Sequence, residues 1–295
     1  LLVFNDTRVL PARLFGRKET GARVEVLLLH RIAPGRWDGL AYPGRRLQEG
    51  ARVRFGPSGE LAAEVTGIGA EGTRILQFEA KGGPEAADEL LHRLGQMPLP
   101  PYIHERLDDP ERYQTIYARE EGSAAAPTAG LHFTPRVFER LRERGVRCAY
   151  VTLHVGIATF RPVKVERIEE HVMHEEWYSV PEETARAIRE CPGRVVPVGT
   201  TTLRCLESAA EGPRAVRPGT GVTRLYITPG YQFRAADALL TNFHMPRSSL
   251  LILVSAFAGV EPVRAAYREA LEAGYRFLSF GDAMLIERPT AERPI

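Results

Sequence analysis

The sequence predicts an α/β domain with a mixed sheet, interrupted by an inserted small all-β barrel domain. Three observations support this fold class. Short β-type runs separated by Gly/Pro turns fill residues 14–81, strands and helices alternate after residue 82, and an apolar strand opens the chain. A length of 295 residues also favours two folding units. We therefore expect a discontinuous α/β catalytic domain at 1–13 and 82–295, and a β-barrel domain at 14–81.

The first strand, 1–4, is apolar and runs into the polar sequence NDTR at 5–8. Short strands are then expected at 23–30, 37–42, 51–55, 61–66 and 74–78. Turn signals separate them at 34–35, 43–44, 56–59 and 69–72. Short strands at regular spacing are typical of a small barrel.

After residue 82 we expect helices at 85–94, 135–144, 181–190, 201–210 and 263–273, and strands at 147–153, 194–199 and 276–280. Residues 97–102 should be extended, 109–117 a turn and short helix, and 250–258 a buried helix or strand. The helix after residue 134 has the clearest signal, because Thr134 is a good N-cap, Pro135 suits the first helical position and Gly145 ends the pattern.

Composition excludes several classes of protein. Apolar residues make up 44% and charged residues 26%, which is ordinary for a globular chain. The net charge of +2 argues against recognition by overall charge, although all but three of the 39 basic residues are arginine. Arginine suits phosphate and base contacts, but a codon bias would also explain the excess.

Cysteine usage and apolar run lengths indicate the cellular setting. The three cysteines lack metal spacing, which favours a reducing cytoplasm. The longest apolar runs, 24–29 and 250–260, are too short for a membrane helix. The chain begins LLVF without methionine or a basic leader, so we expect no signal peptide and infer that an upstream segment is missing.

Polar clusters stand at the expected strand ends, where α/β proteins build their sites. Residues 126–134 read APTAGLHFT, and His132 lies just before a helix N-terminus that favours anions. Residues 152–162 read TLHVGIATFRP, and His154 follows a buried strand, where it could act as an acid or base. Either histidine could instead be structural.

Two further clusters offer ligands for a metal or an anion. Residues 171–176 read HVMHEE, an H-x-x-H pair without an evident third metal ligand, so substrate contact, acid/base work or a solvated turn remain alternatives. Residues 198–208 read VGTTTLRCLES, which predicts an anion or carboxylate cradle at a helix start. Arg204 and Glu207 would share a helix face, and a plain ion pair between them is the alternative. Motifs of dinucleotide folds and P-loop ATPases do not occur.

The last two clusters lie near the C-terminus. Residues 241–249 read TNFHMPRSS before an apolar segment, which indicates an interior-facing site. Residues 275–284 read YRFLSFGDAM, where a strand should end at 281–282 and leave the Asp282 carboxylate at the sheet edge. Helix capping by Asp282 is the alternative.

In this order the clusters resemble the signature of QueA, the S-adenosylmethionine:tRNA ribosyltransferase-isomerase family of queuosine biosynthesis. The resemblance covers nearly the whole chain, through 1–15, 98–103, 126–134, 154–162, 171–175, 199–208, 241–259 and 275–286. Departures are conservative: Ala158 replaces a usual glycine, Thr202 a serine and Cys205 a threonine. Family members begin upstream of Leu1, in line with a missing segment.

The resemblance implies a transferase that moves and isomerises the ribosyl moiety of S-adenosylmethionine onto the 7-aminomethyl group of preQ1 at the tRNA wobble position. The products would be epoxyqueuosine-tRNA, adenine and methionine. It further implies no metal, flavin or nicotinamide cofactor, with S-adenosylmethionine as a consumed co-substrate. The expected partner is the preQ1-modified tRNA anticodon loop, and the expected state a cytoplasmic monomer.

This reaction needs a base beside the sulfonium-activated C5′ and an acid for the departing adenine, and histidine suits both. The predicted catalytic residues are His132, His154, His174, His244 and Asp282. The predicted substrate-binding residues are Asn5, Asp6, Arg8, Thr128, Gly130, Gly156, Thr159, Glu175, Gly199, Thr200, Thr201, Arg204, Glu207, Asn242 and Ser248. Arg204 and the 199–202 turn would hold a carboxylate such as that of the methionyl group. Candidate phosphate contacts are Arg45, Arg46, Arg52, Arg54, Arg140, Arg142, Arg144 and Arg147, with a solvated charged face as the alternative for each.

Three other functions are compatible with parts of the sequence. The chain could be a non-catalytic RNA-binding module with the barrel as its platform, although binding alone needs fewer buried polar groups. It could be a metal-dependent hydrolase that uses His171 and His174. It could also be an ordinary methyltransferase, which would release S-adenosylhomocysteine instead of methionine and adenine.

Overall fold

A computed structural model describes the chain except for residues 70–71, 104–106, 157–162, 164 and 289–295. The chain forms two compact units. The first, here the α/β unit, comprises Leu1–Arg8, Arg106–Glu120 and Ala126–Ile295. The second, here the barrel unit, comprises Val9–Glu105 and Glu121–Ala125.

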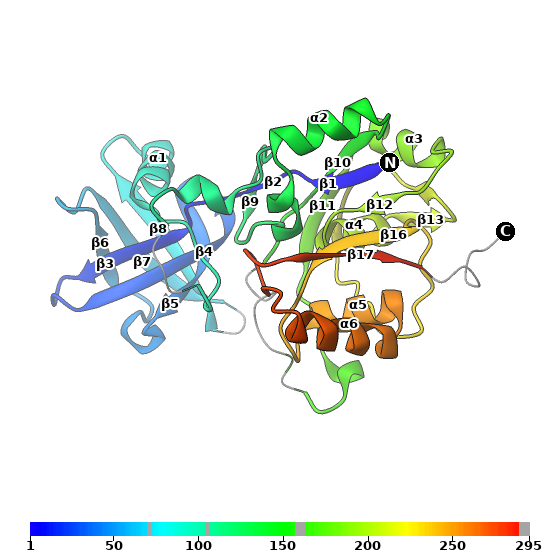
Figure 1. The fold of residues 1–295 in the computed structure, drawn as a ribbon. Helices are drawn as coiled ribbons and strands as arrows, with labels where there is room; N and C mark the ends of the chain where they lie inside the picture. The colour runs from blue at the N-terminus through cyan, green and yellow to red at the C-terminus, as the bar shows by residue number, and fades with distance from the viewer. Residues whose placement is uncertain (70–71, 104–106, 157–162, 164, 289–295) are drawn as a thin grey trace. The chain divides into compact units, whose positions relative to one another are not determined.

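The barrel unit is built on a closed antiparallel barrel, as the sequence predicts (Figure 1). Its strands follow the order β3-β4-β5-β8-β7-β6 and have the bounds β3 (Arg13–Lys18), β4 (Arg23–Ala33), β5 (Arg36–Tyr42), β6 (Arg52–Phe55), β7 (Leu61–Ile68) and β8 (Arg74–Ala80). Alternate residues such as Leu14, Val26 and Phe78 point inward and fill the core. Helix α1 (Pro84–Leu94) packs Ala87 and Leu91 onto the same core, and η1 (Gly44–Arg46) follows β5.

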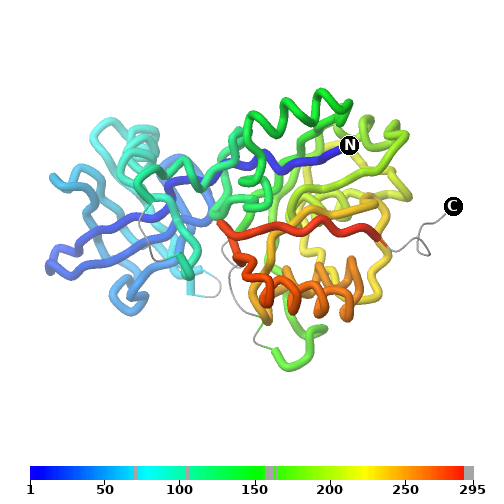
Figure 2. The backbone as a smooth tube through the Cα atoms, in the orientation of Figure 1, coloured from blue at the N-terminus to red at the C-terminus, as the bar shows by residue number. Residues whose placement is uncertain are grey.

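The α/β unit contains the predicted mixed sheet, in the order β12-β1-β10-β11-β15. The strands are β1 (Leu2–Asn5), β10 (Cys148–Leu153), β11 (Glu176–Val180), β12 (Val196–Pro197) and β15 (Gly219–Thr223). Strands β12, β1 and β10 run parallel, whereas β11 and β15 are antiparallel to their neighbours. Figure 2 shows the N-terminal segment and the last strand within this unit.

A parallel bridge between Val198 and Leu240 extends this order beyond β12. It brings in β16 (Ala238–Asn242), which pairs antiparallel with β17 (Ala283–Glu287). The carboxyl ends of β16, β12, β1 and β10 therefore meet at one edge, which is where ligands bind in open α/β sheets. We call this region the carboxyl edge.

The helices of the α/β unit are α2 (Pro135–Glu143), α3 (Glu182–Arg189), α4 (Thr200–Ser208), α5 (Ser249–Ala258) and α6 (Val260–Glu272). Thr134 caps α2 as predicted, accepting a hydrogen bond from the Val137 amide at 3.3 Å. A buried cluster with Leu203, Leu239 and Val254 packs α4, β16 and α5 together. The shorter elements are β2 (Thr7–Val9), η3 (Pro110–Tyr113), β9 (Glu120–Ser123), η4 (Thr128–His132), η6 (Ile168–Glu170), β13 (Ala210–Gly212) and β14 (Ala215–Val216).

The predicted last strand at 276–280 is wrong, because this segment is a tight loop before β17. Its apolar residues, which suggest a strand, pack as a loop instead: the Phe277 ring lies 4.9 Å from that of Phe243. The segment at 250–258, for which helix and strand were both possible, is helix α5.

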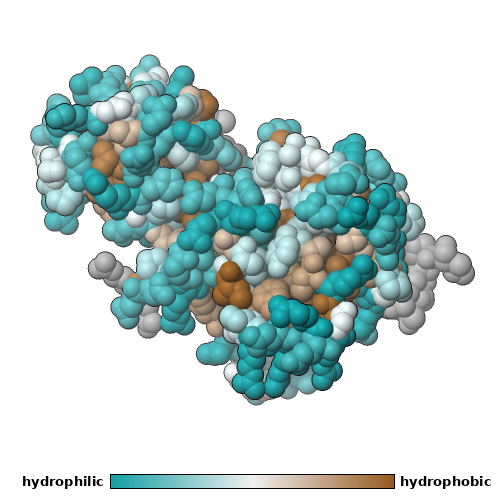
Figure 3. Space-filling model, turned by 90° about the horizontal axis from the view of Figure 1, so that it is seen from above, coloured by the Kyte–Doolittle hydropathy of each residue, from teal (hydrophilic) through white to brown (hydrophobic). Residues whose placement is uncertain are grey.

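Figure 3 shows a mostly hydrophilic face with hydrophobic groups in small areas, a distribution that is normal for folded proteins. Among the described residues no single helix is long and apolar enough to cross a membrane. Helices α5 and α6 reach the length and apolar composition of a membrane span only when taken together, and the pair is bent by 114°.

Candidate active site

Asn5 organises the middle of the carboxyl edge. It is fully buried at the end of β1, and its Nδ2 donates to the Leu153 carbonyl at 2.9 Å and to Thr201 Oγ1 at 3.4 Å. Its Oδ1 accepts from the amides of Leu153 and Thr7, at 3.0 and 3.1 Å. Asn5 therefore joins the ends of two strands to the first turn of α4.

Asn242, at the end of β16, controls the chemical state of His132. Its Nδ2 donates to His132 Nε2 at 3.1 Å and to the Leu278 carbonyl at 3.2 Å, and its Oδ1 accepts from Thr128 Oγ1 at 3.3 Å. Because His132 Nε2 accepts, its imidazole is neutral and carries its proton on Nδ1. Partial burial lowers the pKa of His132, and the charge of Asp282 opposes this shift.

The loop before β17 holds Asp282 in place, together with the Leu278 carbonyl that accepts a hydrogen bond from Asn242. Leu278 has φ 72°, a left-handed conformation that costs a leucine about 1–3 kcal/mol. The amide of Arg276 donates to Asp282 Oδ2 at 2.7 Å, and Gly281 has no room for a side chain. Strained backbone that is held this firmly is frequent at functional sites.

His154 follows β10 on the other side of the carboxyl edge. Its Nδ1 lies 2.8 Å from Thr7 Oγ1, and its ring stacks on Trp177 with centroids 4.9 Å apart and planes at 21°. The hydroxyl and the indole fix both the orientation and the rotation of the imidazole. A histidine held in this way is suited to proton transfer.

Glu176 is a buried carboxylate that is not among the site residues predicted from the sequence. It forms an ion pair with Arg204 Nη1, with side-chain exposures of 5% and 8%, and accepts from the Gly156 amide at 2.9 Å. Arg204 also donates from Nε to the Leu225 carbonyl at 3.0 Å. Strand parity could have identified Glu176, because it shares the buried face of β11 with Tyr178 and Val180.

The predicted anion cradle forms the start of α4. Gly199 has φ 93° and ψ 149°, a conformation available almost only to glycine, and its amide donates to the Leu240 carbonyl at 2.8 Å. Thr200, Thr201 and Arg204 line a small pocket of about 20 Å³ that also involves residues of α5. Arg204 therefore lies beside the predicted cradle, but its guanidinium forms an ion pair with Glu176.

Asp6 and Arg8 form contacts within the protein. Asp6 is buried and accepts from Thr152 Oγ1 at 2.7 Å and from Arg119 at 2.8 Å. Desolvation raises its pKa, although these two partners oppose the shift. Arg8 forms an ion pair with Glu111 at 2.5 Å. The structure thus places both residues beside the carboxyl edge with partners of their own.

Glu207 and Ser248 likewise stabilise local structure. The Glu207 carboxylate accepts from the amides of Arg234 and Ala235 at 2.9–3.1 Å, and burial raises its pKa. Ser248 caps α5 and accepts from the Leu251 amide at 3.2 Å. In the structure both residues therefore stabilise the protein itself, a role that these residue types can fill as readily as substrate binding.

Gly130 and His244 are packed against aromatic residues. A side chain at Gly130 would lie 2.0 Å from the Tyr117 hydroxyl, so glycine permits this close approach. His244 Nε2 lies 2.9 Å from Thr241 Oγ1, and its backbone amide donates to the Tyr267 hydroxyl at 2.8 Å. Burial lowers the pKa of His244 to about 4, so this imidazole is neutral near pH 7.

The remaining predicted residues are exposed or outside the described part of the chain. His174 and Glu175 are exposed in an irregular segment after η6, and Glu175 forms an ion pair with Arg224 at 2.8 Å. Thr159 lies outside the described residues. Among the residues that the structure describes, no group of three or more His, Cys, Asp or Glu side chains could hold a metal ion.

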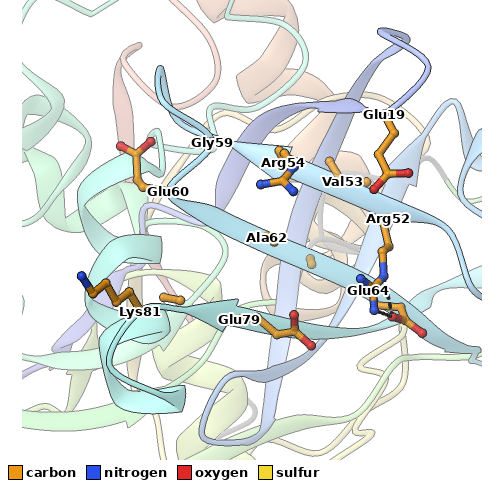
Figure 4. Close-up of a pocket in the computed structure, with 12 residues that line it drawn as sticks. Glu19, Arg52, Val53, Arg54, Gly59, Glu60, Ala62, Glu64, Glu79 and Lys81 are labelled. Atoms are coloured by element: carbon orange, nitrogen blue, oxygen red, sulfur yellow. Dashed lines mark hydrogen bonds and ion pairs between the residues drawn. The ribbon is translucent and has the colours of Figure 1, made fainter.

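The barrel unit has a separate, charged hollow of about 390 Å³ on its outer surface. Figure 4 shows its acidic and basic side chains on the strands and the adjoining turns, with Arg52 joined to Glu64. This hollow has none of the buried polar interactions found at the carboxyl edge. We therefore take the carboxyl edge as the candidate active site.

Comparisons with known proteins agree over nearly the whole chain. The family described as "Queuosine biosynthesis protein" matches residues 1–286. A protein of Moorella thermoacetica named S-adenosylmethionine:tRNA ribosyltransferase-isomerase is 57% identical over 97% of this chain and 84% of its own length. One of Pelotomaculum thermopropionicum with the same name is 55% identical, with the same coverage. The crystal structure of S-adenosylmethionine tRNA ribosyltransferase from Thermotoga maritima is 40% identical, with a TM-score of 0.47 over 97% of this chain and 81% of that one.

Proposed function

The chain belongs to the queuosine biosynthesis protein family, and from this premise we propose that it transfers and isomerises the ribosyl moiety of S-adenosylmethionine onto preQ1 in tRNA. The acceptor is the 7-aminomethyl group of preQ1 at the wobble position, and the products are epoxyqueuosine-tRNA, adenine and methionine. The observation that carries the proposal is the 57% identity, over 97% of the chain, to a relative named for this activity.

His154 is our candidate for the base. The sulfonium of S-adenosylmethionine acidifies the C5′ hydrogens, so a positioned imidazole can remove one of them. Thr7 and Trp177 hold the ring of His154, which reduces the reorganisation needed before proton transfer.

His132 is our candidate for the group that assists adenine departure. Its Nε2 accepts from Asn242, so Nδ1–H is available to donate a hydrogen bond to the leaving nitrogen of adenine and stabilise the charge that develops there. His244, with its pKa lowered to about 4, is better suited to supporting the loop than to moving protons near neutral pH.

The N-terminus of α4 is our candidate for the site that binds the methionyl carboxylate of the substrate. The free N–H groups at a helix start favour a carboxylate, and Gly199 shapes the turn that exposes them. Glu176 supports this region through its ion pair with Arg204 and the hydrogen bond that it accepts from the Gly156 amide.

The proposal is tested by incubating the chain with S-adenosylmethionine and preQ1-bearing tRNA. We expect adenine and methionine to appear only when the modified tRNA is present. Release of S-adenosylhomocysteine would indicate a methyltransferase instead. We expect the reaction to run in the cytoplasm, on a monomer, with S-adenosylmethionine consumed and no metal required.

Two substitutions separate the roles of the histidines. With S-adenosylmethionine deuterated at C5′, His154→Gln should abolish deuterium loss at that carbon. His132→Gln should preserve deuterium loss while slowing adenine release. Equal effects of both substitutions on both steps would contradict this assignment.

A further inference from the structure

Three arginines form a ladder on the outer surface of the barrel unit. Arg17 on β3 is directly opposite Arg54 on β6 and directly opposite Arg23 on β4. Opposite residues in antiparallel strands project from the same face with Cβ atoms about 4.5–5.5 Å apart. All three side chains are exposed, so three like charges stand in one row across three strands.

The ladder differs from several other arginines of the barrel, which are paired with carboxylates. Arg13 pairs with Glu25 at 2.7 Å, Arg52 with Glu64 at 2.7 Å, and Arg31 with Asp88. Within the described chain, no ion pair joins a ladder arginine to a carboxylate. Like charges placed opposite each other destabilise a sheet, so this row has a cost that no carboxylate of the described residues offsets, although Arg17 donates to the Gly21 carbonyl at 3.1 Å.

Arg52 and Arg54 show the contrast on a single strand. They are two residues apart and share the outer face of β6, yet only Arg52 is joined to a carboxylate in Figure 4. The hydrogen bond to Glu64 and the charges of Glu64 and Glu79 raise the pKa of Arg52. From the sequence these two arginines are equal candidates for phosphate contact, and the structure separates them.

Further groups of the kind that bind RNA lie beside the ladder. Lys18 donates to the Arg46 carbonyl at 2.8 Å, and Arg46 to the Arg23 carbonyl at 3.2 Å, which adds two cations. The ladder lines an open groove of about 970 Å³ that also includes Phe15, 49% exposed, on the same face of β3. Among the groove's described lining residues, Glu19 is the one carboxylate.

We propose that the ladder Arg17–Arg23–Arg54 is a docking surface for the sugar-phosphate backbone of the substrate tRNA, with Phe15 as a stacking platform for an unpaired base. A row of arginines suits phosphates, and an exposed aromatic beside it suits single-stranded RNA. The identity of the RNA as tRNA rests on the proposed function. The uncompensated positive charge of the row rests on the structure alone.

The test replaces all three ladder arginines by glutamine in the full chain, with Arg52→Gln as the matched control. Binding of preQ1-bearing tRNA is followed by fluorescence anisotropy between 50 and 200 mM salt. We expect the triple variant to bind about tenfold or more weakly, and its slope of log K against log salt to fall by about 2. Arg52→Gln should change the dissociation constant less than about twofold, because Glu64 already neutralises this arginine.

Kinetics and folding provide independent readouts. The KM for tRNA should rise in the triple variant while the KM for S-adenosylmethionine stays constant, and thermal unfolding should occur at the same or a higher temperature. Phe15→Leu should weaken binding several-fold with an unchanged salt slope, since stacking releases no counterions. Unchanged affinity in Phe15→Leu would overturn the stacking role.

Three results would overturn the proposal that the ladder binds the tRNA backbone. They are wild-type affinity in the triple variant, an equal loss in Arg52→Gln, or a wild-type chain that binds anionic phospholipid vesicles but not tRNA. Failure of the proposed function would look different: the wild-type chain would release no adenine, while the anisotropy experiment would still decide whether the ladder binds RNA.

Discussion

Asn242 and His132 are 110 residues apart in sequence, and the amide of the first donates a 3.1 Å hydrogen bond to Nε2 of the second. The orientation of the amide is fixed independently, because the Leu278 carbonyl accepts from the same nitrogen and Thr128 donates to the oxygen. Asn242 therefore keeps His132 in one tautomer, with Nδ1 as the donor.

Asn242→Asp should reverse this arrangement. A carboxylate in place of the amide accepts a hydrogen bond, so it would draw a proton onto Nε2 and raise the pKa of His132. We expect kcat for adenine release to fall about 100-fold, within the range for loss of acid–base catalysis. Nitrogen-15 NMR of labelled histidine should show the proton on Nε2. A variant with the wild-type tautomer and wild-type kcat would contradict the role of Asn242.

The ion pair between Glu176 and Arg204 should be essential for stability. Both side chains are buried, so Glu176→Gln leaves an uncompensated guanidinium that costs about 3–5 kcal/mol of unfolding free energy. Urea unfolding measures this cost. In the double variant with Arg204→Met, the loss should be smaller than the sum of the two single losses. Additive losses would show that the two side chains act independently.

Local signals in the sequence were sufficient for most of the fold. Turn spacing predicted the barrel, and Thr134 with Pro135 located the start of α2. The strand expected at 194–199 is present but has only the two residues of β12, because its length depends on pairing with β1, a contact that no local pattern records. The 276–280 error has a similar cause, since aromatic residues that pack around Phe243 look like a strand in sequence.

The candidate site was predicted as a set of residue types at strand ends, and its pairings came from the structure. His132, His154 and Asn242 do lie at the carboxyl edge, but which of them share hydrogen bonds depends on contacts distant in sequence. Glu175 and Glu176 are adjacent and chemically alike, and only the parity of β11 shows which one is buried. The pairing of Glu176 with Arg204 depends on how α4 packs on the sheet.

The lowered pKa of His244 predicts a pH-dependent contribution to stability. The folded imidazole has a pKa of about 4 against 6.5 for an ordinary histidine, so below pH 6.5 the unfolded chain binds a proton that the folded chain does not. The free energy of unfolding should therefore fall as the pH decreases from 6.5 to 4, by about 3 kcal/mol from this group. Above pH 6.5 His244 contributes nothing to the slope.

His244→Gln isolates this effect. Other titrating groups, including the Asp6 and Glu207 carboxyls with their raised pKa values, are common to both chains and cancel in the difference. Urea unfolding of wild type and variant at several pH values should give a gap that changes between pH 6.5 and 4. A constant gap would mean that the folded imidazole titrates normally.

The turn at Gly199 should be as sensitive as the histidines, for a conformational reason. With φ 93° and ψ 149°, an alanine there would be strained by about 1–3 kcal/mol and would displace the first turn of α4. We expect Gly199→Ala to lower both the unfolding free energy and the affinity for S-adenosylmethionine. Gly193→Ala is the control, because a side chain at that turn meets no atom within 4 Å. If both substitutions had the same small effect, the start of α4 would not be the part of the carboxyl edge that holds the substrate.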